Sequence, residues 1–231
     1  MRFQILIFFG ILMCGPFLIA QSEYNQLDNE GKRHGVWNKN YEDSSQLRYV
    51  GQFDHGKEVG TFKFYCEECE TNPSVIKVFN DNDDIAEVKY YTISGKLLSE
   101  GKMDKKDRIG EWIYYQKKSK DVITSEHYVS GKLDGVKTTY YPNGEKAEEE
   151  RYDLGIKKGE NNYFSHKGVL LKKLLYDNTQ LHGPAVYYDA TGSVTIEGQY
   201  KKGKKNGLWR YYKNGKLTKE ETYPIVRKKS N

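Results

Sequence analysis

Two cysteines separated by two acids form the sharpest chemical motif of the sequence, Cys66-Glu67-Glu68-Cys69. A close cysteine pair in an exported chain favours a disulfide. A redox-active pair normally starts a helix, whose dipole lowers the thiol pKa, whereas this pair follows an expected strand and flanks two acids. A zinc site would need two further ligands, and the sequence has no second Cys-x-x-Cys. We predict a small disulfide loop between Cys66 and Cys69, with free thiols, metal binding and redox chemistry as the alternatives.

Histidines and acid clusters are the other candidates for chemistry. His34 and His182 precede glycines, where Asp134 and Asn206 stand in related segments, so turn roles are expected for them. The remaining histidines, His55, His127 and His166, have no acid or nucleophile at a matching position, which favours surface roles over catalysis or metal binding. We therefore expect no catalytic, metal-binding or cofactor-binding residue, and no enzyme.

The two acid clusters do not match a calcium loop. The run "NDNDD" at residues 80–84 lacks the glycine and terminal glutamate of such a loop, so we interpret it as a solvated turn. Weak calcium binding at Asp81, Asp83 and Asp84 is the alternative. The run Glu148–Glu150 would alternate between the faces of a strand and could not present three carboxylates to one ion.

Glycines recur every 24 to 25 residues, which indicates a repeat architecture. We call them anchor glycines: Gly35, Gly60, Gly110, Gly135, Gly159, Gly183 and Gly207, with Ile85 at the missing midpoint. A second glycine closes a tight turn in five repeats: Gly95, Gly144, Gly168, Gly192 and Gly215. Asn-Gly and Asp-Gly between runs rich in Tyr, Val and Trp are strong hairpin signals. The sequence predicts an all-β, elongated, single-layer antiparallel sheet of about eight tandem hairpins over residues 31–224.

Aromatic residues keep step with this period. The fifth position after the anchor predicts an aromatic ladder on one face: Tyr65, Tyr90, Tyr115, Tyr140, Phe164, Tyr188 and Tyr212. The second and fourth positions share the opposite face, which is less regular. We expect that face to contact a partner through Trp37, Phe62, Trp112, Tyr114, Tyr187, Trp209 and Tyr211. Ordinary sheet packing is the alternative for each of these aromatic side chains.

The ends of the chain differ from the repeats. Residues 1–20 place Arg2 before an apolar run and predict a signal peptide, hence export to the periplasm, the cell surface or the medium. An uncleaved membrane anchor is the alternative. Residues 21–30 are expected to form a linker and residues 225–231 a basic tail. A formal net charge of only +5 argues against a nucleic-acid partner, and the lysine pairs at expected turns favour solvated charge over a stripe for anionic lipids.

The segments "GKKNGLWRYYKNGKLTKEETY", "GKLDGVKTTYYPNGEKAEEERY" and "GKRHGVWNKNY" resemble the bacterial variant of the MORN (membrane occupation and recognition nexus) repeat. The resemblance weakens between Phe64 and Met103. It implies an elongated sheet of hairpins and no catalytic residues. Proteins of this kind are often labelled antitoxin components, and eukaryotic relatives are linked to membrane lipids and scaffolding.

The function that the sequence favours is an exported, non-catalytic module that binds or organises another protein. The alternatives are an antitoxin or immunity-like protein that masks a toxin, a binder of anionic membrane surfaces, and an envelope thiol oxidoreductase that uses Cys66 and Cys69.

Overall fold

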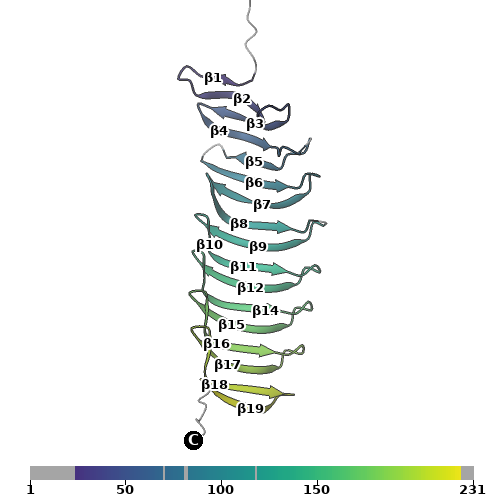
Figure 1. The fold of residues 1–231 in the computed structure, drawn as a ribbon, viewed down its shortest axis with the longest axis vertical. Helices are drawn as coiled ribbons and strands as arrows, with labels where there is room; N and C mark the ends of the chain where they lie inside the picture. The colour runs from purple at the N-terminus through teal and green to yellow at the C-terminus, as the bar shows by residue number, and fades with distance from the viewer. Residues whose placement is uncertain (1–23, 70, 81–82, 118, 225–231) are drawn as a thin grey trace, which may run out of the picture.

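The structure, a computed structural model, describes residues 24–69, 71–80, 83–117 and 119–224. These residues form one open antiparallel sheet of 19 strands that follow one another along the long axis of the molecule (Figure 1). The all-β prediction of tandem hairpins is thereby confirmed. A helix long and apolar enough to span a bilayer is not found in the described part of the chain.

Eight hairpins make up most of the sheet. They are β2 (Arg33–Asn40) with β3 (Leu47–Asp54), β4 (Lys57–Phe64) with β5 (Val75–Phe79), β6 (Ile85–Tyr91) with β7 (Leu97–Asp104), β8 (Asp107–Tyr115) with β9 (Val122–Val129), β11 (Gly135–Tyr140) with β12 (Lys146–Asp153), β14 (Gly159–Phe164) with β15 (Leu170–Asp177), β16 (Gln180–Tyr188) with β17 (Val194–Lys201), and β18 (Lys204–Lys213) with β19 (Lys216–Tyr223). The strands β1 (Gln26–Leu27), β10 (Lys132–Leu133) and β13 (Ile156–Lys157) are two residues long.

The turns between hairpins lie elsewhere than the sequence suggested. Asn206-Gly207 was expected to turn, but β18 runs through it, and the positive φ of Gly207 (70°) serves a bulge inside the strand. The turn that enters β18 is Lys202-Gly203, whose φ values of 50° and 76° are those of a type I′ turn. Asn214-Gly215 is a turn, as predicted. A primed turn and a bulge with glycine in the left-handed region both need positive φ, so Asn-Gly is compatible with either.

The strand register places an aromatic residue opposite the anchor glycine in the first and last hairpins. Gly35 lies opposite Phe53, and Gly207 lies opposite Tyr223, eight residues after the second glycine of its repeat. In the third repeat, Ala86 is the residue opposite Met103. Ala86 therefore occupies the anchor position that the sequence spacing assigned to Ile85.

The two faces of the sheet differ in burial. We call one the aromatic face; its buried residues are Phe53, Phe62, Ala86, Val88, Trp112, Leu174, Ala185 and Trp209. The other, the polar face, carries ion pairs such as those of Arg210 with Glu197 and Glu220. The hydrophobic core of this single layer is thus a strip along one face.

The predictions for the chain ends have different outcomes. The predicted signal peptide, residues 1–20, and the basic tail, residues 225–231, lie outside the described residues. Within the predicted linker, Gln26–Leu27 pairs with β2, so the sheet begins earlier than residue 31.

Candidate functional site: the aromatic face

The aromatic face is organised by bulges that bring a large ring over a glycine. Between the pairs Glu197–Arg210 and Gln199–Asn206, the single residue Gly198 of β17 faces three residues of β18 that end in Trp209. A Cβ added at Gly198 would lie less than 3.0 Å from the Trp209 ring. The absence of a side chain at that position therefore lets the indole lie against the neighbouring backbone.

The same arrangement recurs in two earlier repeats. Gly101 underlies Trp112, and Gly51 underlies Phe62, with similarly close approaches. The indole N–H of Trp112 donates to the carbonyl of Lys102 at 3.0 Å. The indole N–H of Trp209 makes the corresponding bond to the carbonyl of Gln199 in the preceding strand, β17. Each of the two buried indoles thus satisfies its N–H group, as buried tryptophans require.

Three of the seven residues predicted to contact a partner are core residues. Phe62, Trp112 and Trp209 are exposed by 1%, 0% and 1%. Trp209 packs edge-on against Tyr200 and Tyr223, with ring centroids 5.1 and 6.3 Å away. Covered rings offer no contact surface, so the partner-binding prediction no longer has a physical basis for these three and depends on the other four.

The other four residues are half-buried. Trp37 donates its indole N–H to the carbonyl of Gln26 at 2.9 Å. The hydroxyl of Tyr187 lies 3.1 Å from that of Tyr200. Burial, together with hydrogen bonding to Tyr200, raises the pKa of Tyr187 above its ordinary value. This hydroxyl therefore stays protonated at neutral pH.

The remaining two, Tyr114 and Tyr211, each accept a hydrogen bond from a cation. Arg108 donates to the Tyr114 hydroxyl at 2.7 Å, and Lys205 donates to the Tyr211 hydroxyl at 3.0 Å. Burial first, then hydrogen bonding to Tyr128, raises the pKa of Tyr114. Both tyrosines are partly exposed.

Cations cover the aromatic strip at one repeated position, two residues before the anchor glycine. Arg33, Arg108, Lys157 and Lys205 occupy it. The Arg108 guanidinium lies 4.5 Å from the Trp112 centroid, and Lys205 Nζ lies 4.2 Å from that of Trp209. Contacts of this kind are favourable, more so when partly desolvated. Lys205, predicted as solvated turn charge, is instead part of the packing.

A charged segment interrupts the strip in its middle. Lys137 Nζ lies 3.8 Å from Glu126 and 3.6 Å from Glu150, and Lys157 Nζ lies 2.5 Å from Glu150. Asn161 beside them is fully buried. Its amide nitrogen lacks a hydrogen-bond partner among the described residues. The sequence indicates this segment by Lys137 and Asn161, which stand at the second position after the anchor glycine, where other repeats have Trp.

The acid runs behave as expected where they are described. Within Glu148–Glu150, the outer two acids contact Lys157, while Glu149 pairs with Lys146 on the opposite face. The three carboxylates therefore do not converge on one point. Asp83 caps its own turn by accepting from the backbone N–H of Ile85 at 2.9 Å.

The predicted ladder is divided between the two faces. Tyr90 packs against Trp112 on the aromatic face, with ring centroids 6.0 Å apart, because the anchor of its repeat is Ala86. The rest of the ladder lies on the polar face and does not stack. Its described rings make no ring contact with one another, because members of successive hairpins are separated by two strand spacings of about 4.8 Å each. Instead, Tyr115 donates to Glu100 at 2.5 Å and Tyr212 donates to Glu197 at 2.7 Å. Burial and the Glu100 carboxylate raise the pKa of Tyr115 to about 12.

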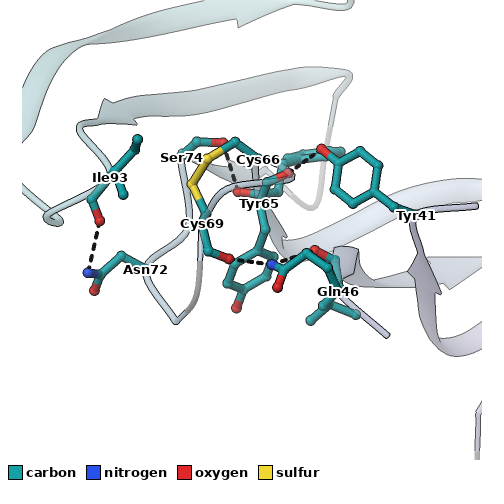
Figure 2. Close-up of a disulfide and its surroundings, with 10 residues drawn as sticks. Tyr41, Gln46, Tyr65, Cys66, Cys69, Asn72, Ser74 and Ile93 are labelled. Atoms are coloured by element: carbon teal, nitrogen blue, oxygen red, sulfur yellow. Dashed lines mark hydrogen bonds between the residues drawn. A yellow bond between two sulfur atoms is a disulfide. The ribbon is translucent and has the colours of Figure 1, made fainter. Parts of the chain in front are cut away.

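Cys66 and Cys69 form the predicted disulfide, in the connection from β4 to β5 (Figure 2). Cys69 is 1% exposed, and its carbonyl accepts a hydrogen bond from the Gln46 side chain. Tyr41 donates to the carbonyl of Tyr65 at 2.7 Å in the same region. The disulfide is thus packed into the loop edge of the sheet, where a covered sulfur suits a structural role better than thiol exchange.

Comparisons with known proteins leave the family open. No protein-family model matches the chain, and no curated protein matches it. Membership of the MORN repeat family stays a prediction, although the sheet of hairpins that the resemblance implies is present.

Proposed function

We propose that the chain is a non-catalytic, exported binding or scaffold module that holds a protein partner along the aromatic face. The supporting observation is the half-buried outer layer of this face, in which tyrosine hydroxyls and cations recur with the repeat. A single-layer sheet keeps each face accessible along its length, so one partner can contact several repeats at once. Tyrosine combines apolar area with hydrogen bonding, as protein interfaces favour.

A protein fits this face better than an anionic membrane surface does. Arg108 and Lys205, its prominent cations, already contact rings and hydroxyls. The charged middle of the strip balances Lys137 and Lys157 against glutamates. Such mixed charge selects a complementary partner rather than a uniformly negative one. The disulfide supports export, since disulfides persist in oxidising compartments.

Adjacent tyrosines on opposite faces allow a matched test. Cross-linking in the native envelope should capture a protein partner, and the double variant Tyr187→Ala/Tyr211→Ala should lose that capture. The control is Tyr188→Ala/Tyr212→Ala, which removes the same two ring types from the polar face in the same strands. We expect this control to capture the partner as the wild-type chain does.

Circular dichroism and urea unfolding should establish that both double variants keep the sheet. If the folded Tyr187/Tyr211 variant captured the same protein at wild-type yield, the aromatic face would not be the binding surface. If only the control lost capture, the polar face would be the binding surface instead. Capture of lipid alone would contradict the proposal of a protein partner.

A further inference from the structure

The first hairpin brings two imidazoles and a carboxylate together at a tight turn. Gly35 of β2 lies opposite Phe53 of β3, so the next residues along each strand, His34 and Asp54, stand side by side. His55 follows Asp54 as the first residue of the turn into β4, with φ of 45°. His34, predicted as a turn residue, lies within β2. The backbone register therefore sets this cluster.

The candidate ligand atoms of the three side chains lie slightly farther apart than the ligands of a bound metal ion. His34 Nδ1 lies 3.5 Å from Asp54 Oδ1, and His55 Nε2 lies 3.9 Å from the same oxygen. One ligand atom from each residue falls within 4.8 Å of the others. Ligand bonds of about 2.0–2.1 Å in tetrahedral zinc sites imply ligand separations of about 3.4 Å. All three residues are exposed, so small side-chain rotations suffice to close the gap.

A fourth residue, Asp28, orients one of the imidazoles. Asp28 Oδ2 lies 2.6 Å from His55 Nδ1, and the Asp28 side chain is only 7% exposed. Its Oδ1 accepts from the backbone N–H groups of Lys32 and Glu30, each at 2.9 Å. In the tautomer whose Nδ1–H donates to Asp28, the Nε2 atom of His55 carries the free lone pair.

Metal-binding histidines typically donate their other ring N–H to a carboxylate in this way. In this tautomer, the Nε2 atom that can bind a metal is the one near Asp54. Two imidazole nitrogens and one carboxylate oxygen favour zinc and similar borderline ions over magnesium or calcium. Three protein ligands also leave a fourth position for water or for a donor from a partner.

The cluster belongs to the first hairpin and not to the repeat in general. His182 precedes Gly183 as His34 precedes Gly35, and Gly183 lies opposite Tyr200 as Gly35 lies opposite Phe53. The residues after Tyr200 are Lys201 and Lys202, which replace the carboxylate and the second imidazole. The same backbone thus offers His182 no second or third ligand from those positions.

We propose that His34, Asp54 and His55 bind a divalent transition-metal ion, with zinc as the best-fitting ion and Asp28 as the positioning residue. The ion joins β2 to the turn between β3 and β4 at the N-terminal end of the ribbon. End repeats in such proteins lack one neighbour, so a metal contact there supplies stability that inner repeats obtain from packing. The proposal is independent of the partner-binding function.

The test is a calorimetric titration of the untagged, disulfide-bonded chain with zinc chloride, in a buffer that does not chelate metal. We expect one zinc ion per chain and a higher melting temperature with zinc. His34→Gln and His55→Asn should each weaken binding at least tenfold; asparagine tolerates the positive φ at residue 55. Asp28→Asn should weaken binding about 10-fold to 100-fold while keeping the stoichiometry. His182→Gln is the matched control and should bind as the wild type does.

Urea unfolding without metal separates a lost ligand from a lost fold, since the ligand variants should keep wild-type midpoints there. Absence of one-to-one binding in the wild-type chain would overturn the proposal. Equal affinity in the folded His34→Gln and His55→Asn variants would overturn it as well, because the ion would then lie elsewhere.

Discussion

The indole of Trp209 lies against the backbone of Gly198 in the neighbouring strand, where any side chain would collide with it. The carbonyl of the next residue, Gln199, accepts the indole N–H at 3.1 Å. Glycine and tryptophan are therefore one structural unit: the small residue leaves space, and the large ring fills that space. Because Gly101 and Trp112 repeat this contact, the unit is a recurring means of building a core on a single-layer sheet.

Gly198→Ala should destabilise the C-terminal repeats by about 1 to 3 kcal/mol, because the added Cβ would lie less than 3.0 Å from the ring. Gly198 has no positive φ, so backbone strain does not add to this cost. Urea unfolding followed by tryptophan fluorescence measures the change in the free energy of unfolding.

A double-mutant cycle with Trp209→Leu provides the control. Trp209→Leu alone should cost about 3 kcal/mol, but it removes the clash, so alanine at residue 198 should then cost at least about 1 kcal/mol less than in the wild-type chain. Additive costs would show that the two residues do not form one unit.

The repeat and its period could be predicted from the sequence, because they depend on local turn chemistry and on strict spacing. The exact turn could not. Asn206-Gly207 satisfies a bulge as well as a primed turn, and the choice depends on how β17 pairs with β18. The third anchor lies one residue later than the spacing suggested, at Ala86, because no glycine marks the position there.

The candidate site was less predictable, because burial depends on which residues lie next to a ring across the sheet. The sequence does place Gly51, Gly101 and Gly198 two residues before an aromatic residue or methionine, and this recurrence could have identified the buried rings. Lysine pairs carry no such signal. Side chains alternate between the two faces along β18, so the position of the turn decides whether Lys204 or Lys205 covers Trp209. The cluster of the first hairpin brings together Asp28, His34 and the pair Asp54–His55 from three segments of the chain. The spacing of residues within one repeat could not reveal this contact.

Lys157→Met should destabilise the sheet by about 2 kcal/mol, the range of a hydrogen bond to a charged group in a partly buried site. Lys157 is 14% exposed and lies 2.5 Å from Glu150, which is 12% exposed. Its loss leaves a largely covered carboxylate without its closest cation. The midpoint of urea unfolding at pH 7 measures this.

The neighbouring Lys158→Met is the matched control. Lys158 is 54% exposed and pairs with Asp153 at 3.3 Å. Solvent-exposed pairs of this kind contribute about 1 kcal/mol or less, so this variant should remain close to the wild type. Equal losses in the two variants would mean that the charged middle of the strip is no more than a solvated surface.

The Glu150 carboxyl should make stability fall in acid. Burial acts to raise its pKa, but the hydrogen bond and charge of Lys157, with the charge of Lys137, outweigh burial and bring the pKa below its ordinary 4.5. A carboxyl whose native pKa is lower than its unfolded pKa stabilises the fold above the unfolded value, and this contribution is lost as pH falls through the native value. The stability gap between wild type and Glu150→Gln should therefore be largest near pH 7 and shrink below about pH 4.5.

Urea midpoints at intervals from pH 7 to pH 3 measure this gap, with Glu67→Gln, an exposed acid of the disulfide loop, as the control that should follow the wild type throughout. A gap that stayed constant across this range would mean that Glu150 stabilises the sheet by packing alone. A gap that widened in acid would mean that its native pKa is raised, and that burial prevails over the two lysines.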